Sequence, residues 1–270
     1  MTEAALIQPN DREFKLFQQL ILQRLGIHVP DQKKALVSNR LWKRLQARNM
    51  HRFQDYYELI NRPDEHGELT HALELLTTNE TYFFREPRHF DFMREQFLPE
   101  KRNQANLRIW SAACSSGEEI YSIAMLLTDQ RNNGWELVGS DVNQTMLDKA
   151  RNAIYHNDRA QHIPDAYRRR FCRKGTGPWA GHLRVIPELR QKIQLRRIQL
   201  HEPFPDIGRF DLVFLRNVMI YFDDNTRGDV VRRVTEVLNP GGYLFVGHAE
   251  SLHGLRADLK QVLPAIYQRR

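Results

Sequence analysis

Hydrophobic residues recur at helical spacing through the first part of the chain. Asn10 and Glu13 form a capping-box pattern and Gly26 is a typical stop signal, so a helix is predicted between them. Its apolar face comprises Phe14, Phe17, Leu20, Ile21 and Leu25. Further helices are predicted over about 31–50, 53–60 and 65–76. Since no strand pattern occurs here, residues 1–78 are predicted to form a small all-helical N-terminal domain.

After about residue 100 the pattern changes to short apolar runs that alternate with amphipathic segments. This alternation favours a mostly parallel sheet with helices on both faces. The α/β domain is predicted to span 101–270, and 79–100 is predicted to be a linker followed by a connecting helix that begins at Pro87. Strands are predicted at 107–112, 136–140, 192–199, 210–216, 242–247 and 262–268, and helices at 118–130, 143–154 and 225–238.

A glycine-rich segment interrupts this alternation after about Ile154. Gly175, Gly177 and Gly181 separate two short runs that favour strands. We therefore expect an inserted antiparallel β-hairpin subdomain over about 160–191.

The segment 107–127 has the pattern of a strand, a tight turn and a helix, which is the unit of Rossmann-like nucleotide-binding sheets. Small residues occupy the turn, and the pair Glu118 and Glu119 opens the helix. Two carboxylates at a helix N-terminus would repel a pyrophosphate. The pattern therefore favours a cofactor that carries hydroxyls and a cation, although the two acids could instead only complement the helix dipole.

Two further polar residues follow predicted strands. Asp141 lies about two dozen residues beyond Gly117, where an acid commonly holds ribose hydroxyls, and the alternative is a helix-capping role. Asn217 follows the strand at 210–216, where it could line a cofactor or simply form a turn. The chain lacks the proline-rich tetrad that many enzymes use here to methylate exocyclic amines, which argues against a nucleic-acid substrate.

The net charge of +7 indicates an acidic partner. No acidic residue occurs between Asp31 and Asp55, and the basic residues of this segment form one helical stripe. The stripe could be a solvated face or a docking surface for an acidic helical bundle, and Trp42 is its one aromatic residue, which weakens the case for nucleic acid. The stripe comprises Lys33, Arg40, Lys43, Arg44 and Arg48.

Cysteine and histidine usage predicts no metal. The two cysteines, Cys114 and Cys172, form no cluster, and none of the eleven histidines is spaced from another histidine or a cysteine as metal ligands usually are. No apolar run is long enough to span a membrane, and the polar beginning lacks the pattern of a signal peptide. A cytoplasmic monomer is expected.

Four segments occur together and in order: TTNETYFFRE at 77–86, WSAACSSGEEIYS at 110–122, RNVMIYF at 216–222 and GHAES at 247–251. They resemble the chemotaxis receptor methyltransferases of the CheR family. The resemblance covers nearly the whole chain and implies a Rossmann-like S-adenosylmethionine-dependent methyltransferase domain with a mostly parallel seven-stranded sheet. The implied reaction transfers a methyl group to glutamate carboxylates of methyl-accepting chemotaxis receptors, giving methyl esters and S-adenosylhomocysteine.

The resemblance also implies roles for single residues. Arg85 would pair with the methionine carboxylate of the cofactor, Glu119 with its ammonium group, and Asp141 with its ribose hydroxyls. Arg85 and Tyr221 would shape the catalytic pocket. Further cofactor contacts would come from Asn79, Thr81, Gln199, Leu200, Asn217 and Val218. Gln199 departs from the family pattern, in which asparagine is usual.

Two partner surfaces follow from the resemblance. The basic stripe would dock on the cytoplasmic helical bundle of the receptor, so that the enzyme is recruited to membrane receptor arrays. The inserted subdomain could bind a C-terminal receptor pentapeptide as an added strand, as in some family members, through Lys174, Gly175, Gly177 and Arg184. The alternative is a plain structural hairpin. The competing hypotheses are a nucleic-acid methyltransferase and a non-catalytic regulator that binds S-adenosylmethionine.

Overall fold

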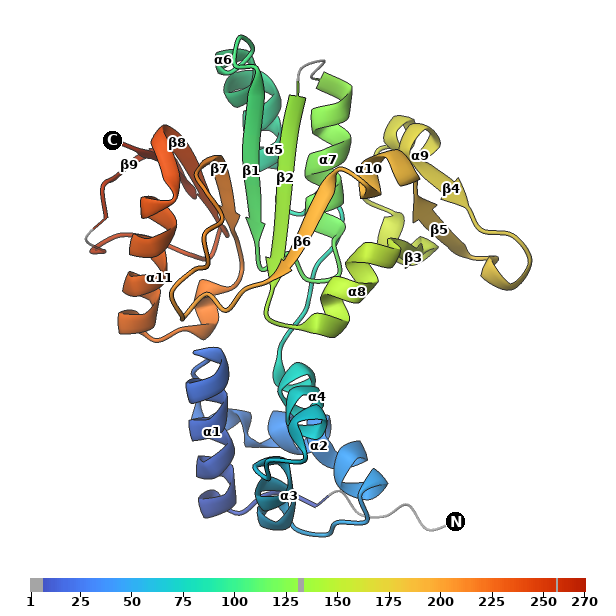
Figure 1. Ribbon diagram of the computed structural model, residues 1–270, viewed down its shortest axis with the longest axis vertical. Coiled ribbons are helices and arrows are strands. Elements are labelled where there is room, and N and C mark those ends of the chain that lie inside the picture. Colours follow the sequence, from blue (N-terminus) through green and yellow to red (C-terminus); the bar gives the residue numbers. More distant parts are fainter. Residues whose placement is uncertain (1–6, 131–133, 256) are drawn as a thin grey trace. The chain divides into compact units, whose positions relative to one another are not determined.

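The computed structural model describes residues 7–130, 134–255 and 257–270 (Figure 1). Contacts divide the chain into two units at the boundary between Thr78 and Asn79. The first unit contains the residues up to Thr78 together with Tyr221–Thr226. The second contains Asn79–Ile220 and Arg227–Arg270. No helix within the described ranges is long and apolar enough to cross a membrane.

The first unit is helical, as predicted. Both hydrogen bonds of the capping box are present: the Glu13 amide donates to Asn10 Oδ1 at 2.9 Å, and the Asn10 amide donates to Glu13 Oε2 at 2.8 Å. Gly26 ends the helix in the left-handed region with φ 68°. The helices are α1 (Asp11–Leu25), the 3₁₀ turn η1 (Asp31–Lys33), α2 (Lys34–Ala47), α3 (Phe53–Ile60) and α4 (His66–Leu76).

Aromatic packing forms the core of this unit. Phe17 on α1 is fully buried and meets the ring of Phe53 on α3 edge to face, with the centroids 5.9 Å apart. Leu41 and Leu45 of α2 are also fully buried. Each such side chain stabilises the fold by about 1.5–3 kcal/mol through loss of apolar surface, so packing rather than helix propensity holds these short helices.

The premise that the basic stripe lacks balancing acids is wrong. Arg44 donates to both carboxylate oxygens of the buried Glu68 on α4, at 2.9 and 2.6 Å, and Arg48 pairs with Glu65. The acids were missed because they lie on or just before a different helix, 24 residues from Arg44 and 17 residues from Arg48. The Arg44 guanidinium holds the pKa of Glu68 below its usual range.

Arg40 is also engaged within the first unit. Its guanidinium donates to the carbonyls of Leu76 and Thr77, at 2.6 and 2.9 Å, and so satisfies the C-terminal end of α4. Among the five stripe residues, Lys33 and Lys43 are exposed and make no ion pair with any described residue.

The second unit is built on a seven-stranded, mostly parallel sheet, which confirms the expected fold class (Figure 1). Its order is β6-β2-β1-β7-β8-β10-β9. The β10 strand is antiparallel to both of its neighbours. The strands are β1 (Asn106–Ala112), β2 (Gly134–Asp141), β6 (Ile193–Arg197), β7 (Phe210–Leu215), β8 (Leu238–Val246), β9 (Leu259–Leu263) and β10 (Ile266–Arg269).

Helices pack on the sheet because successive strand residues point to opposite faces. Leu107 and Ile109 of β1 join one apolar cluster with residues of the helices before and after that strand. Trp110, which points the other way, packs against the rings of Phe204 and Phe210. The helices of this unit are α5 (Pro87–Phe92), which continues through a π-helical turn (Met93–Phe97) into α6 (Leu98–Glu100), then α7 (Glu118–Gln130), α8 (Gln144–Asn152) and α11 (Asp224–Glu236).

The single strand predicted at 262–268 is wrong. The segment forms a hairpin of β9 and β10, whose turn contains Pro264 and Ala265. Pro264 has no amide hydrogen for the ladder and Ala265 adopts a left-handed φ of 63°, so the chain reverses here instead of continuing.

The insertion is larger than the predicted hairpin. The expected pair, β4 (Cys172–Lys174) and β5 (His182–Val185), is present, but β3 (Ile154–His156) pairs with the other side of β5. The helix predicted to reach 154 ends at Asn152, because Ala153 turns left-handed with φ 50° and frees the next residues to form β3. The remaining elements are the 3₁₀ turns η3 (Asn157–Ala160) and η4 (Gly177–Trp179), α9 (Asp165–Phe171) and α10 (Pro187–Arg190).

Candidate functional site

The candidate site lies at the carboxyl ends of the central strands. The β1 strand pairs in parallel with β2 on one side and with β7 on the other. From β1 the sheet continues to β2 on one side, and from β7 it continues to β8 on the other side, so the strand order reverses between β1 and β7. In sheets of this kind ligands commonly bind at such a switch point. The residues that follow β1, β2 and β7 are therefore brought together.

The turn after β1 is tight and strained. Ala113 and Ser115 adopt left-handed φ values of 67° and 50°, and Gly117 has φ 99°. A Cβ at Gly117 would lie 2.9 Å from the Ala150 Cβ and from the Tyr155 hydroxyl oxygen, so no larger residue fits without displacing them. The turn therefore brings backbone rather than side chains to the strand end.

Asp141 faces this turn from the end of β2. It is buried, and its two carboxylate oxygens accept hydrogen bonds from the amides of Ser115 and Asn143, each at 2.9 Å. The side chain that caps α8 is Asn143, which accepts from the Met146 amide. Asp141 therefore links the ends of β1 and β2, and a helix cap does not account for its position.

The two acids that open α7 have different surroundings. Glu118 is fully buried and accepts from Arg159 Nε at 2.7 Å, while another nitrogen of Arg159 donates to the carbonyl of Thr81. Glu118 therefore ties the helix to the insertion and to the linker. It is not placed for binding a ligand cation.

Glu119 lies beside the carboxyl end of β1. Oε1 accepts from the Ser111 hydroxyl at 2.6 Å, and Oε2 lies 3.3 Å from Arg216 Nη1. Burial raises the pKa of Glu119 above its ordinary value, although Arg216 acts in the opposite direction. The carboxylate is thus short of positive charge, which is a suitable setting for a cationic ligand group.

Arg216, directly after β7, connects the two sides of the site. Its side chain is 1% exposed, and Nη2 donates to the carbonyl of Arg85 at 2.6 Å. The same nitrogen lies 3.2 Å from Glu86 Oε2. Arg216 thus joins the strand end to the linker and lies between two carboxylates, those of Glu86 and Glu119.

The linker is held against α7 in a strained conformation. Phe84 and Glu86 adopt left-handed φ values of 54° and 57° on either side of Arg85. The Phe84 amide donates to Ser122 Oγ at 2.9 Å, and Arg85 Nη1 donates to the Glu80 carbonyl at 2.9 Å. Left-handed non-glycine residues cost free energy and commonly occur at functional sites. Here they position Arg85 close enough to contribute to the pKa of Glu119.

A buried carboxylate organises the loop after β7. Glu250 accepts hydrogen bonds from the amides of Asn217, Met219 and Gly247, at 2.8, 2.8 and 2.6 Å, and a longer one of 3.3 Å from that of Ile220. Asn217 is left-handed, with φ 56°, and its side-chain nitrogen donates to Glu86 Oε1 at 3.3 Å. Glu250 therefore fixes the direction in which Asn217 leaves the strand.

The other predicted cofactor residues are distributed around these strand ends. The carbonyl of Asn79 accepts from the Ser115 hydroxyl at 3.3 Å, so this part of the linker meets the turn after β1. Gln199 and Leu200 follow β6, the neighbour of β2, and Leu200 is buried. Val218, next to Asn217, is half-buried. Tyr221 groups with the first unit, where its carbonyl accepts from the His28 amide at 2.7 Å.

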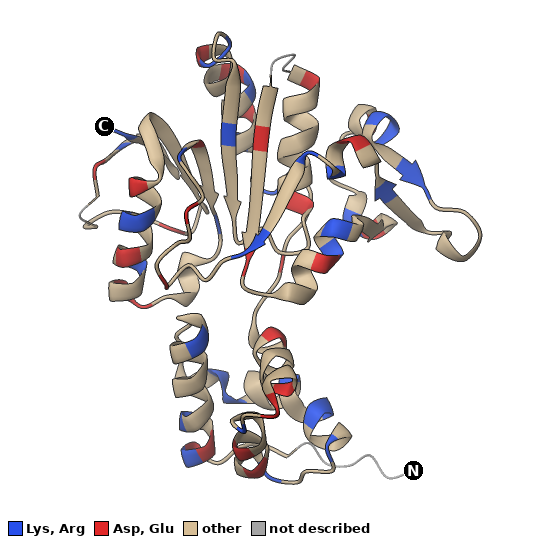
Figure 2. Cartoon of the chain, in the orientation of Figure 1, with Lys and Arg blue, Asp and Glu red and all other residues tan. Residues whose placement is uncertain are grey.

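The residues predicted for the peptide site lie on the insertion. In the order β3-β5-β4, the β4 strand is an edge and carries the exposed Lys174. A Cβ at Gly175 would lie 2.1 Å from the Trp179 carbonyl oxygen, so glycine is required at this turn. Gly177 has φ 56°, and Arg184 on β5 donates to the Asn152 carbonyl at 3.1 Å. Figure 2 shows basic residues on both β4 and β5.

Sequence reasoning missed three residues that organise the site: Glu86, Arg216 and Glu250. One signal was available, because Arg216 is a charged residue directly after a mostly apolar strand, where burial requires a partner. The partners themselves could not be inferred, since Glu86 and Glu250 are distant along the chain.

The comparisons with known proteins identify the family. Residues 12–77 match the family model described as CheR methyltransferase, all-alpha domain, and residues 79–267 match the CheR methyltransferase, SAM binding domain. The chain belongs to the CheR methyltransferase family. The resemblance stated above is thereby confirmed, and the second unit is an S-adenosylmethionine-binding domain.

Several curated relatives cover most of this chain. The chemotaxis protein methyltransferase of Escherichia coli K12 is 38% identical over 94% of this chain and 89% of its own length. The protein of the same name from Salmonella typhimurium is 38% identical over 91% and 86%. Chemotaxis protein methyltransferase 2 of Pseudomonas aeruginosa is 38% identical over 88% and 86%.

The raised pKa of Glu119 predicts a pH-dependent cofactor affinity. As the pH falls, the Glu119 carboxyl takes up a proton at a higher pH than an ordinary glutamate does, and it then no longer attracts a cationic group. We expect calorimetry to show weaker binding of S-adenosylhomocysteine as the pH is lowered. Glu119→Gln should bind weakly at neutral pH and lack this dependence. An affinity of the unmodified protein that stays constant with pH would contradict the assigned role.

Proposed function

We propose that this protein transfers a methyl group from S-adenosylmethionine to glutamate side chains of chemotaxis receptors, forming glutamate methyl esters. The observation that supports the proposal is the arrangement of charged side chains at the carboxyl ends of the central strands. The relatives of this chain are named chemotaxis protein methyltransferases. The carboxylates of Glu119 and Asp141 lie at the ends of neighbouring elements, with the Arg85 guanidinium close to Glu119.

These groups fit the polar parts of the cofactor. Glu119 would hold the ammonium group, since burial leaves its carboxylate short of positive charge. Arg85 would hold the cofactor's carboxylate, and Asp141 would accept from the ribose hydroxyls. Asn79 and Thr81 from the linker, Gln199 and Leu200 after β6, and Asn217 and Val218 after β7 would complete the contacts.

The reaction needs little acid–base chemistry. The cofactor supplies an electrophilic methyl group when bound. A receptor glutamate, with a pKa near 4.3, is already ionised at neutral pH, so no residue has to remove a proton. Rate would come from orientation and exclusion of water. We assign this positioning role to Arg85, and the role of Tyr221, which groups with the first unit, stays a prediction.

Cys114 is not a plausible competing nucleophile. It is buried beneath the turn after β1, and burial together with the nearby Asp141 raises the pKa of its thiol well above the usual range. A thiol that does not ionise is a poor nucleophile, so methyl transfer through a cysteine intermediate is disfavoured.

The direct test is incubation of the protein with methyl-labelled cofactor and receptor-containing membranes. We expect labelled receptor whose label is released by mild base, because carboxyl methyl esters hydrolyse readily. Label that resists base would indicate N-methylation instead. No label despite normal cofactor binding would favour a non-catalytic regulator. Glu119→Gln serves as the variant with a weakened cofactor site.

The remaining exposed part of the basic stripe is proposed to dock on the acidic receptor bundle. Lys33 and Lys43 carry this role, because Arg40, Arg44 and Arg48 already serve contacts within the first unit.

Charge reversal of the two exposed lysines tests this docking. The double variant Lys33→Glu/Lys43→Glu should raise the KM for receptor about tenfold, equivalent to about 1.4 kcal/mol, and leave kcat unchanged. Lys260→Glu, an exposed lysine on β9, is the matched control. A double variant with the KM of the unmodified protein would rule out docking through these lysines.

The insertion is proposed to bind the C-terminal pentapeptide of certain receptors. The open edge of β4 offers backbone groups for an added strand, and Lys174 and Arg184 would attract an acidic peptide with a free carboxylate.

Titration of the protein with a receptor-tail pentapeptide should give saturable binding to the insertion. Lys174→Glu should weaken this binding. Lys149→Glu, which changes an exposed lysine on α8, should leave binding intact. Absence of binding at millimolar peptide would exclude the tether.

A further inference from the structure

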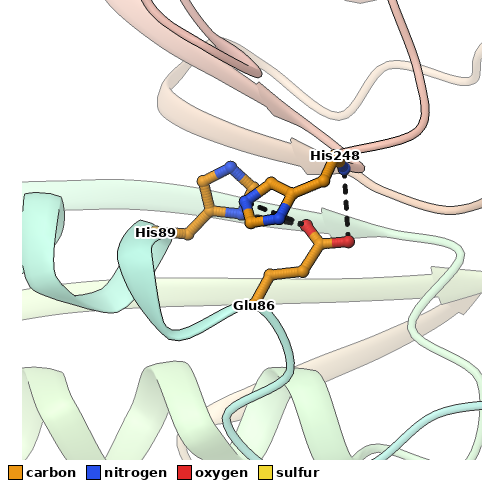
Figure 3. A group of neighbouring side chains, drawn as sticks. All are labelled: Glu86, His89 and His248. Atoms are coloured by element: carbon orange, nitrogen blue, oxygen red, sulfur yellow. Dashed lines mark hydrogen bonds and ion pairs between the residues drawn. The ribbon is translucent and has the colours of Figure 1, made fainter.

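Three potential metal ligands from two distant segments converge beside the strand-end loop. Glu86 and His89 lie at the start of α5, and His248 follows β8 (Figure 3). Glu86 Oε2 lies 3.4 Å from His89 Nδ1 and 3.9 Å from His248 Nε2. One ligand atom from each of the three residues lies within 4.8 Å of the other two. Linear spacing, which led to the expectation of no metal, could not show this arrangement.

His89 is buried with its ring nitrogens unused by hydrogen bonds of normal geometry. Its side chain is 1% exposed, and no described residue forms such a bond with Nδ1 or Nε2. A buried imidazole whose nitrogens make no hydrogen bond of normal geometry can present a lone pair to a metal ion.

Glu86 presents one oxygen to the two imidazoles. Oε2 of Glu86 also lies 3.2 Å from Arg216 Nη2. Oε1 accepts from Asn217 Nδ2 and from the His248 amide, at 3.3 and 3.2 Å. Oε2 has no hydrogen-bond partner among the described residues. It is therefore a buried anionic oxygen that faces two nitrogen ligands.

The local charge balance leaves room for a cation. Two carboxylates, Glu86 and Glu119, lie against the single buried guanidinium of Arg216. Arg216 Nη2 is 3.2 Å from Glu86 Oε2, but its hydrogen bond goes to the Arg85 carbonyl. A cation at Oε2 would weaken the ion pair between Glu86 and Arg216 but would break no hydrogen bond. The half-exposed ring of His248 provides access from solvent.

We propose that Glu86, His89 and His248 form a binding site for a divalent transition-metal ion such as Zn2+. Two imidazoles and one carboxylate are a ligand set that suits zinc, whereas Mg2+ and Ca2+ prefer oxygen ligands alone. The fourth position is left to water or a solvent anion on the His248 side. The Ala265 carbonyl near the His89 ring is the kind of neighbour that orients a metal-binding histidine.

The site bears on the methyltransferase because Glu86 serves both. Its Oε1 holds Asn217, and its Oε2 neighbours Arg216. A metal ion at Oε2 competes with Arg216 for this carboxylate, so occupancy is expected to inhibit methyl transfer reversibly. This consequence rests on the proposed function, whereas the binding itself does not.

Titration of chelator-treated protein with Co2+, a spectroscopic substitute for Zn2+, tests the binding. We expect visible d–d bands of a four- or five-coordinate ion that saturate at one equivalent, and Zn2+ should abolish them. His248→Ala, which changes a partly exposed side chain, should remove the bands and weaken Zn2+ binding at least about tenfold by calorimetry. His253→Ala, an exposed histidine close by, should change neither. Absence of the bands in the unmodified protein would overturn the proposal.

A second histidine pair needs its own control. His156 and His182 on the insertion have ring centroids 5.3 Å apart, and His156 Nδ1 lies 3.0 Å from Asp158 Oδ2. His156→Ala should leave the Co2+ bands intact. Bands that His156→Ala removes and His248→Ala spares would contradict the proposal. Zn2+ inhibition of methyl transfer should disappear in His248→Ala, and inhibition that persists there would overturn the link to activity without affecting the proposed reaction.

Discussion

The site depends on the burial of one guanidinium. The charged guanidinium of Arg216 lies almost completely inside the second unit, so its charge must be met by anions and carbonyls. Glu119 from the helix after β1, together with Glu86 and the Arg85 carbonyl from the linker, provides them. Three segments that are far apart in sequence are thereby held together at the carboxyl edge of the sheet.

This electrostatic arrangement explains why the linker can stay strained. Left-handed residues on both sides of Arg85 cost free energy, and the contacts with Arg216 and Ser122 offset that cost. The loop after β7 is held in the same manner, with the Glu250 carboxylate accepting from successive amides. The side chains proposed to bind the cofactor are thus held by contacts within the protein, which reduces the ordering that binding would otherwise require.

Local patterns predicted the elements, and distant pairings accounted for the errors. The cap formed by Asn10 and Glu13 is encoded within four residues, so the first helix was predicted correctly. The charge balance of the basic stripe was not predicted correctly, because Glu68, which pairs with Arg44, lies on another helix. Arg216 and His248 likewise contact Glu86 only because the ends of different strands lie close together in the fold. The spacing of hydrophobic residues along the sequence does not predict such contacts. The identity of the cofactor came from the family resemblance. The carboxylates alone indicated only that the ligand carries hydroxyls and a cation.

The most direct test of this account is a calorimetric measurement of the affinity of the Arg216→Lys variant for S-adenosylhomocysteine. Circular dichroism should first show that the variant is folded. Lysine keeps the charge but cannot reach Glu86, Glu119 and the Arg85 carbonyl at once. We predict a loss of at least about tenfold in affinity, equivalent to about 1.4 kcal/mol. An Arg216→Lys variant that binds with the affinity of the unmodified protein would contradict the central role of this guanidinium.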